Sequence, residues 1–272
     1  MGDVTLFVCG GGARAILSDA TEAPGVPTVF MNSNSSSTIS MVPEDMPGAY
    51  GDPFLAYSLT LDNSDEIRER LQGVRVVILF SILGGGSGIG MPLGVSEIAH
   101  EMGCRVVSVV GLPMAFEIER RKRAMAVLPQ VLDYSDRVFI LDMGSINRIY
   151  PDVKFIHILR MASRSIVFAV DNLAHMMEGP FFSTFPKKIY TFAYTNDLDP
   201  SKAVTRAMDS TMFETSPDFG KMIVLVSSGF GTAQTESIYY TIVSMTGIVP
   251  DIVKRDDRED TKVLVFLPVH GL

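Results

Sequence analysis

Residues 84–90 have a composition suited to binding an anion. They read GGGSGIG, with five glycines in seven positions, and they follow the strand-like run 74–83. Because glycine carries no side chain, successive backbone N–H groups can converge on one negatively charged group. A helix pattern follows over residues 91–102, so its positive N-terminal end would point to the same place. The spacing therefore predicts a phosphate-binding turn between a strand and a helix.

A second glycine cluster, residues 10–14 (GGGAR), follows the first strand-like run at 4–9. It is not a P-loop, because no Gly-Lys-Ser/Thr ends it, and it does not match the GxGxxG pattern well. Alone, the cluster is equally consistent with a tight turn. A glycine-rich turn after the first strand is nevertheless the usual place for contact with a nucleotide phosphate. Together with residues 84–90, it predicts two such turns side by side at one edge of a sheet.

A third polar segment, residues 113–121 (PMAFEIERR), follows a strand and begins a helix. Glu117 could accept hydrogen bonds from ribose hydroxyls. Arg121 lies one helical turn later on the same face, where it could reach ribose or phosphate. The alternative is a solvated, charged start of a helix, and the two glycine clusters favour the nucleotide-binding interpretation.

Charge and composition narrow the class of protein. The 272 residues are 47% hydrophobic and 20% charged, which suits a well-filled globular core, and the net charge is −8. An acidic chain is a poor partner for nucleic acid or an anionic membrane. Cys9 and Cys104 do not form a disulfide framework and are interpreted as small buried residues in a reducing compartment. The four histidines are scattered, so we expect no metal site built from side chains alone.

Apolar runs alternate with helix patterns in the first half of the chain. Because this alternation is typical of a parallel sheet covered on both faces, residues 1–150 are predicted to form a doubly wound α/β domain, whose ligands bind outside the carboxyl ends of the strands. The expected strands are 4–9, 28–31, 74–83, 105–112 and 137–143.

A long helix and a smaller α+β domain are predicted to follow. The helix pattern 151–177 begins with Pro151, a good first residue of a helix, and carries four charges that argue against a membrane span. We treat 151–178 as a central helix and 187–272 as the second domain. Its expected strands are 188–194, 221–227 and 261–269, and its expected helices are 199–210 and 233–246; the acidic stretch 196–199 is interpreted as a helix N-cap and 255–260 as a hairpin loop. With no leader ahead of the first strand, a cytoplasmic location is expected.

These segments, in this order, resemble the tubulin/FtsZ superfamily of cytoskeletal GTPases. Residues 84–90 are similar to the family's GGGTGTG loop, with Ser87 and Ile89 in place of threonine. Residues 10–14 resemble its first phosphate loop, and residues 113–121 resemble its PFSFEGRRR segment. Residues 32–34 and 48–53 resemble further loops, the latter at the γ-phosphate. The nucleotide-binding residues that the resemblance implies are Gly10, Gly11, Gly12, Ala13, Arg14, Asn34, Gly48, Gly84, Gly85, Gly86, Ser87, Gly88, Ile89, Gly90, Pro113, Glu117, Arg121, Met143, Asn147 and Ser163.

The departures from the family pattern concern hydrolysis and base recognition. Family members carry an acidic Asn-x-Asp-x-x-Asp segment after the central helix, which activates water for GTP hydrolysis in the next subunit. The matching residues 183–188 (STFPKK) contain no carboxylate. Met143 and Ser163 replace the two guanine-reading asparagines, and Asn147 is a candidate substitute for the first. Asn34 in place of aspartate weakens the expected coordination of Mg²⁺.

The resemblance implies a divergent, archaeal or bacterial, FtsZ-like protein of cell division. It would bind GTP or GDP, with Mg²⁺ as a candidate ion, associate with itself head to tail, and hydrolyse GTP weakly or not at all. No C-terminal tail for partner proteins is expected. One alternative is an FtsZ-fold interaction protein that has lost nucleotide binding. A Rossmann oxidoreductase is disfavoured, because residues 32–34 (NSN) offer no acidic group for the ribose.

Overall fold

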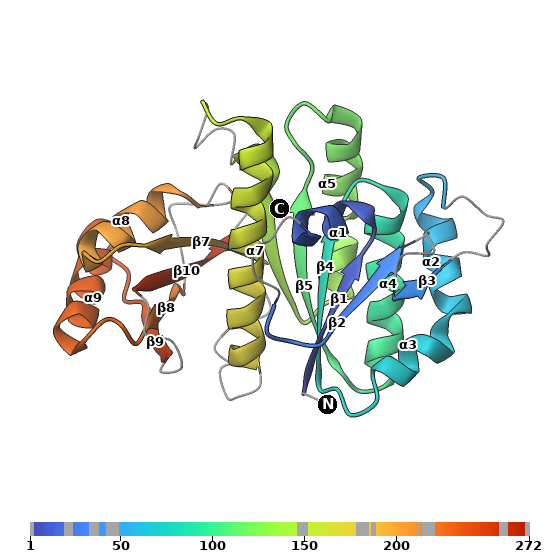
Figure 1. Ribbon diagram of the computed structural model, residues 1–272, viewed down its shortest axis with the longest axis horizontal. Coiled ribbons are helices and arrows are strands. Elements are labelled where there is room, and N and C mark those ends of the chain that lie inside the picture. The colour runs from blue at the N-terminus through green and yellow to red at the C-terminus, as the bar shows by residue number, and fades with distance from the viewer. Residues whose placement is uncertain are drawn as a thin grey trace. The chain divides into compact units, whose positions relative to one another are not determined.

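The computed structural model divides the chain into two compact units (Figure 1). The first comprises residues 1–144 and 152–188, and the second comprises residues 145–151 and 189–272. The residues that the structure describes are 3–18, 24–32, 38–41, 49–145, 152–177, 185, 189–211, 213, 221–255 and 261–269.

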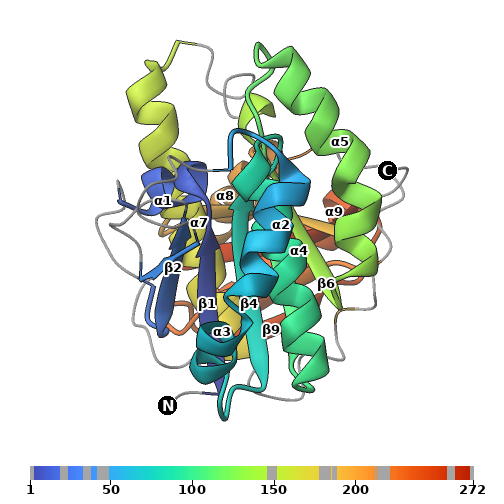
Figure 2. The same ribbon diagram turned by 90° about the vertical axis from the view of Figure 1, so that its right-hand side faces the viewer.

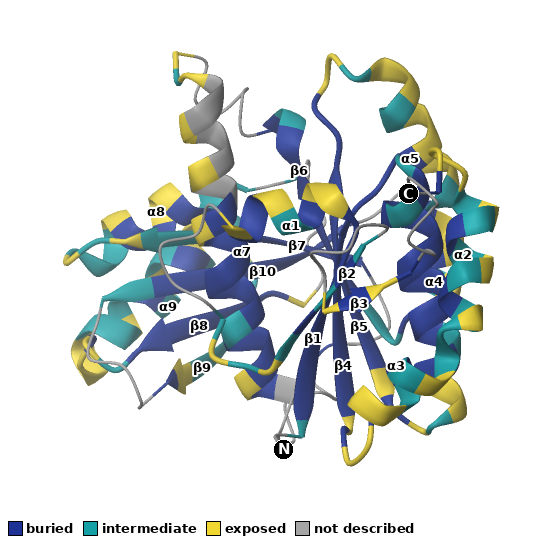
Figure 3. Ribbon diagram, turned by 45° about the vertical axis from the view of Figure 1, so that its right-hand side comes forward, coloured by how far each residue is buried: buried dark blue, intermediate teal, exposed yellow. Residues whose placement is uncertain are grey.

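The sheet of the first unit is parallel. Its strands lie in the order β3-β2-β1-β4-β5-β6, and neighbouring strands in this order pair in parallel. They are β1 Val4–Cys9, β2 Thr28–Asn32, β3 Ile39–Ser40, β4 Val76–Ile82, β5 Arg105–Leu112 and β6 Arg137–Asp142. The near-continuous burial of β1 and β4, visible in Figure 3, explains why the sequence shows apolar runs there rather than alternation. The predicted α/β fold is confirmed.

Helices cover both faces of this sheet. Figure 2 shows α1 and α7 on one side, with α2, α3 and α4 on the other. The helices of this unit are α1 Gly11–Ser18, α2 Pro53–Asp62, α3 Ser64–Arg70, α4 Gly86–Glu101, α5 Ile118–Asp133 and α7 Phe155–Met177. On the α4 side, Val95 and Ile98 belong to one apolar cluster with Phe7 and Leu79 of the strands. The sheet therefore holds the turns after β1 and β4 at one edge, since these strands are paired in register.

The second unit has a smaller, mixed sheet in the order β7-β10-β8-β9. Strands β7 (Ile189–Asn196) and β10 (Lys262–Val269) are antiparallel, as are β10 and β8 (Ile223–Ser227), whereas β8 and β9 (Asp251–Arg255) are parallel. Helices α8 (Pro200–Asp209) and α9 (Thr232–Thr246) bury their apolar faces against this sheet. An α+β arrangement is what the sequence predicts here.

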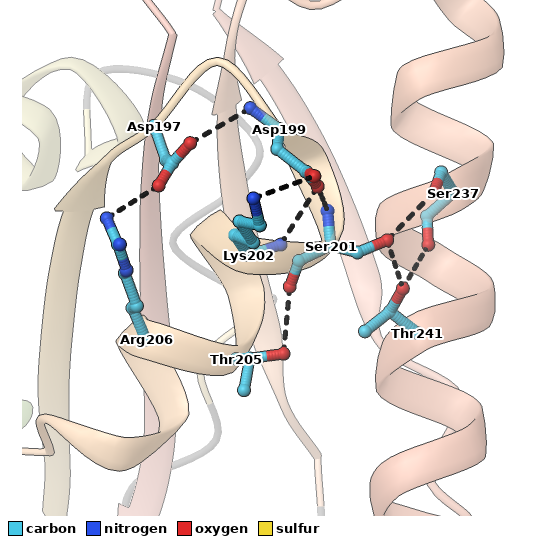
Figure 4. A network of polar contacts seen from close by, with 8 residues as sticks. All are labelled: Asp197, Asp199, Ser201, Lys202, Thr205, Arg206, Ser237 and Thr241. Carbon is cyan, nitrogen blue, oxygen red and sulfur yellow. Dashed lines mark hydrogen bonds and ion pairs between the residues drawn. The ribbon is translucent and has the colours of Figure 1, made fainter.

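Polar contacts position α8 against α9 (Figure 4). The Asp199 carboxylate accepts hydrogen bonds from the N–H groups of Ser201 and Lys202, at 3.0 and 3.1 Å. The Ser201 hydroxyl lies 3.2 Å from that of Ser237 and 3.1 Å from that of Thr241 on α9. The interpretation of residues 196–199 as a helix N-cap is confirmed.

Several predicted element boundaries were wrong. Helix α4 begins at Gly86 rather than residue 91, because its first turns are made of the glycines themselves. Helix α7 begins at Phe155 rather than Pro151, which lies outside the described residues. Arg255 is the buried last residue of β9 and does not belong to a loop. Helix α2 was not named from the sequence, although Asp52 caps it and Pro53 begins it.

Both cysteines are free and buried, as predicted. Burial raises the pKa of each thiol above its ordinary value.

Within the ranges given above, no helix has the length and apolar character needed to cross a membrane. In the same ranges, no three His, Cys, Asp or Glu side chains are grouped so that they could hold a metal ion.

Candidate functional site

A cavity of about 230 Å³ opens at the carboxyl ends of β1 and β4. Three turns line it. The first is the turn after β1, with Gly10, Gly11 and Gly12, and the second is the turn after β4, with Gly85, Gly86, Ser87 and Gly88. The third is the segment before α2, with Ala49, Tyr50 and Gly51, and Arg120 of α5 completes the wall. We call this cavity the glycine cradle.

Two helix N-termini meet at the glycine cradle. Helix α1 begins at Gly11 and α4 begins at Gly86. Among the bonds that enter these helices, the Arg14 N–H donates to the Gly10 carbonyl at 3.1 Å, and the Ile89 N–H donates to the Gly85 carbonyl at 3.2 Å. The N–H groups just before Arg14 and Ile89 have no acceptor in their own helix. These donors and the two helix dipoles favour an anion in the cavity.

Glycine fits these positions for two different physical reasons. A Cβ on Gly88 would lie 2.0 Å from the Ile82 carbonyl oxygen, and one on Gly86 would lie 2.6 Å from the Gly51 carbonyl carbon. These positions are therefore glycine because backbones pack there without room for a side chain. Gly85 differs, because the atom nearest to its added Cβ is an Arg120 guanidinium nitrogen at 4.0 Å. Gly85 thus leaves space that a ligand can use.

The turn before α2 carries backbone strain at the cradle. Tyr50 has a φ of 49°, and it alone among the described non-glycine residues has a positive φ. Gly51 follows with a φ of 80°. Such a conformation costs free energy and persists where the surroundings enforce it, often at functional sites. Here the Asp52 carboxylate fixes the turn by accepting hydrogen bonds from the first N–H groups of α2.

The charge of the glycine cradle suits a phosphate. Arg120 is the charged residue among the described lining residues, and no carboxylate lines the cavity. Its side chain is 42% exposed and pairs with the Glu117 carboxylate three residues earlier. Because the Arg120–Glu117 pair is partly in water, replacing Glu117 with a ligand oxyanion as the partner of Arg120 costs little free energy.

Cys9 also lines the cavity, but burial raises the pKa of its thiol far above the neutral range. The thiol therefore does not act as a nucleophile.

The structure brings seven of the sequence-predicted residues together at the glycine cradle: Gly10, Gly11, Gly12, Gly85, Gly86, Ser87 and Gly88. The other predicted residues of these two turns do not line the cavity and contact other parts of the protein. Ala13 is buried, Arg14 lies over the Phe30 ring at 5.7 Å, and an added Cβ on Gly84 would meet the Arg120 carbonyl oxygen. Ile89 is buried in α4, and a Cβ on Gly90 would strike the backbone of α2.

The residues expected to hold ribose and base have partners within the protein. Arg121 forms a double contact with the Asp142 carboxylate, at 2.6 Å for each nitrogen, and donates to the Pro113 carbonyl at 2.9 Å. Glu117 accepts the Met114 N–H at 3.1 Å.

The structure describes two of the residues at guanine-reading positions, Met143 and Ser163, and both are buried. Met143 is 4% exposed, and Ser163 is fully buried and donates a hydrogen bond to the Ile16 carbonyl of α1. Asn34, Gly48 and Asn147 lie outside the described residues.

The sequence analysis did not select six of the lining residues as site residues: Cys9, Ala49, Tyr50, Gly51, Ile82 and Arg120. The range 48–53 was singled out as a loop, and Gly51 is a common signal for a turn with positive φ, whereas nothing in the sequence indicates the positive φ of Tyr50. Arg120 is adjacent to Arg121, and from sequence alone nothing distinguishes the two. The choice depends on Asp142, which engages Arg121 and leaves Arg120 to face the cavity.

Comparisons with known proteins agree with this geometry. Residues 21–151 match the model of the "Tubulin/FtsZ family, GTPase domain". The cell division protein FtsZ 1 of Pyrococcus furiosus is 31% identical over 134 residues, which cover 49% of this chain and 36% of that protein. The FtsZ of Haemophilus influenzae is 30% identical over 135 residues, covering 49% of this chain and 32% of that protein.

Solved structures extend the likeness of fold to nearly the whole chain. An empty FtsZ dimer from M. jannaschii has a TM-score of 0.79 at 19% identity, covering 97% of this chain and 87% of that chain. CetZ from Methanosaeta thermophila has a TM-score of 0.72 at 14% identity, covering 100% of this chain and 88% of that chain.

Residues 21–151 thus resemble the GTPase domain of the tubulin/FtsZ family, and nearly the whole chain has the fold of an FtsZ structure. Together with the FtsZ relatives, these findings support a divergent FtsZ-like protein. The aligned stretch spans about a third of the length of the FtsZ relatives.

Proposed function

We propose that this protein binds a guanine nucleotide, with the phosphates in the glycine cradle. The observation that carries the proposal is the cavity itself, whose described lining has two glycine-initiated helix N-termini, one arginine and no carboxylate. At about 230 Å³ the cavity is smaller than the roughly 300–1,000 Å³ typical of whole-ligand sites. It therefore suits a phosphate chain, with ribose and base extending past its mouth.

Arg120 has a defined part in this proposal. In the structure its guanidinium pairs with Glu117 beside the cavity. Phosphate oxygens offer the same guanidinium a bidentate, charge-assisted contact, which is stronger than a half-exposed carboxylate pair. Mg²⁺, where it accompanies the nucleotide, would be held mainly by phosphate oxygens and water.

We further propose that GTP turnover is slow. Phosphoryl transfer requires a group that positions and activates the attacking water. The segment 183–188, where relatives by resemblance carry acids, has none in this chain. Its described residue, Phe185, is fully buried and packs edge-on against Phe139 at 5.4 Å between ring centroids. Phe185 therefore contributes to the core, and binding without rapid hydrolysis is the expected outcome.

Self-association in the cytoplasm is the remaining part of the proposal. Relatives are named as cell division proteins, and one structural neighbour is an FtsZ dimer. By analogy we propose a cell-division or cytoskeletal role through head-to-tail contact of copies of this chain.

Nucleotide binding and turnover are tested separately. Thermal unfolding of the purified protein is measured with GTP, GDP and ATP, and phosphate release is followed over a range of protein concentrations. We expect GTP and GDP to stabilise the protein, by about 2.7 kcal/mol at one hundred times the dissociation constant, and ATP to have less effect. Phosphate release should be slow and independent of protein concentration. GTP turnover that rises with protein concentration would contradict the proposed slow site.

A second candidate is an FtsZ-fold interaction protein without nucleotide. The observations that favour it are the burial of Met143 and Ser163 and the engagement of Arg121 by Asp142. In that case no nucleotide would shift the unfolding temperature. Sedimentation would then show whether the protein still associates.

A further inference from the structure

A second, larger cavity lies in the first unit, between α2, α4 and α5. Its volume is about 430 Å³, and it shares no lining residue with the glycine cradle. Figure 2 shows α2 and α4 side by side, and α4 contacts α5. Apolar side chains from all three helices line it, among them Pro53, Ile89, Leu93 and Val127. We call this cavity the apolar groove.

Packing of the helices explains why the apolar groove stays open. A Cβ on Gly90 would lie 2.2 Å from the Pro53 carbonyl oxygen, so α2 and α4 meet backbone to backbone on one side. Helix α5 instead buries Ala124, Leu128 and Val131. Its adjacent stripe, residues 123, 127, 130 and 134 at helical spacing, is left lining the groove. The groove thus stays open because α2 packs closely against α4, whereas α5 buries a different stripe of its surface.

The groove is apolar along its walls and positive at one residue. Phe54 at its rim is 85% exposed, a large apolar surface left in water. Arg123 is the one charged lining residue among those described, and in the described ranges no carboxylate lies within ion-pair distance of it. The Tyr57 hydroxyl at the groove donates to Glu97 and so satisfies that acid. A desolvated anion would therefore meet an available cation here, in a chain that is otherwise acidic.

We propose that the apolar groove is a binding site for an amphipathic organic anion, a molecule with an apolar body and one carboxylate or sulfonate. The apolar body would cover Phe54, Leu93 and Val127, and the anionic group would contact Arg123. The volume lies within the roughly 300–1,000 Å³ of small-molecule sites, and residues of three helices line it. A hollow of this form suits a small molecule better than an extended partner helix, which needs a long open face.

The test uses the absence of tryptophan from this chain. Phe54→Trp introduces a single reporter at the groove, on an exposed residue whose replacement leaves the core intact. Decanoate, below its micelle-forming concentration, is the probe, and decanol is its neutral equivalent. We expect decanoate to shift the tryptophan emission to shorter wavelength and to do so saturably. Tyr240→Trp, 67% exposed on α9 in the other unit, is the matched control and should show no shift.

Charge recognition is tested in the Phe54→Trp background. Arg123→Gln should weaken decanoate binding by about three- to five-fold, as expected for one partly exposed ion pair, and leave decanol unchanged. Lys122→Gln is the matched control, because Lys122 is on the same helix, does not line the groove and pairs with Glu119. This control should bind decanoate as tightly as the unmodified background.

Three results with the variants would overturn the proposal. They are the lack of a saturable shift with Phe54→Trp, equal shifts with Tyr240→Trp, and decanoate binding that is insensitive to Arg123→Gln. An emission shift that depends on protein concentration alone would also overturn it, since a second copy of the chain would then cover the groove. No nucleotide is present in these measurements, so their outcome is independent of the proposed nucleotide site.

Discussion

Gly88→Ala tests whether the glycine cradle depends on close backbone packing. The added Cβ would lie 2.0 Å from the Ile82 carbonyl oxygen and 3.0 Å from its carbon, well inside the 3.4 Å where ordinary contact begins. The obstacle is the end of β4, which is paired with β1 and β5, so it does not yield as a flexible side chain would. Overpacking in such places costs 1–3 kcal/mol, and rigid backbone on both sides argues for about 3 kcal/mol.

This cost corresponds to a fall in the unfolding temperature of roughly 6–12 °C for a domain of this size. Circular dichroism during thermal unfolding measures it. Gly85→Ala is the first control, because its Cβ meets nothing closer than 4.0 Å and its φ of −110° suits any residue. Gly73→Ala is the second, because it has a φ of +75° and open space, so it isolates backbone strain at about 1 kcal/mol.

The expected order of destabilisation is therefore Gly88→Ala first, Gly73→Ala second and Gly85→Ala last. A Gly88→Ala protein as stable as the wild type would refute the packing argument. Equal destabilisation by Gly85→Ala and Gly88→Ala would refute the distinction between packing glycines and a glycine that faces the cavity. Under the proposed function, Gly85→Ala should instead weaken nucleotide binding by about ten-fold, because its methyl group projects into the cradle.

Three further predictions follow from single contacts. Arg120→Ala should lower nucleotide affinity about ten-fold in fluorescence titrations and leave the unfolding temperature within about 2 °C, since its pair with Glu117 is half exposed; unchanged affinity would contradict its assigned part. Asp199→Ala should cost about 1 kcal/mol in urea unfolding through loss of the α8 cap, whereas Asp199→Asn should restore most of it. The hydrogen bond to Glu97, with desolvation and the charge of that carboxylate, raises the pKa of Tyr57 to about 12. The free energy of folding that the protonated phenol contributes is therefore complete below pH 10 and is lost between pH 10 and 12. In absorbance titrations, Glu97→Gln should lower the pKa of Tyr57 toward its ordinary value of about 10, and an unchanged titration would contradict the pairing.

The strands of the first unit were largely predictable from the sequence. Runs such as 4–9 and 105–112 are mostly apolar and buried along nearly their whole length, and burial on both faces of a parallel sheet produces that pattern directly. The acidic cap before α8 was equally predictable, because Asp199 and Pro200 act through local hydrogen bonding and backbone geometry. Elements whose bounds depend on packing between distant segments were not predictable. The start of α4 at Gly86 is an example, because α2 and the turn before it approach the backbone of α4 closely at Gly86 and Gly90.

The sequence alone determined that two glycine turns follow two strands. That information is local, because only glycine permits the positive φ of Gly10 and Gly84 and the close approach of backbones at Gly88. Only the tertiary structure decided which side chains face the cavity between the turns. Arg120 and Arg121 are adjacent and chemically identical, but Asp142, at the end of another strand, engages one and leaves the other at the glycine cradle. A contact between residues far apart in the chain carries no local signal, so that assignment required the fold.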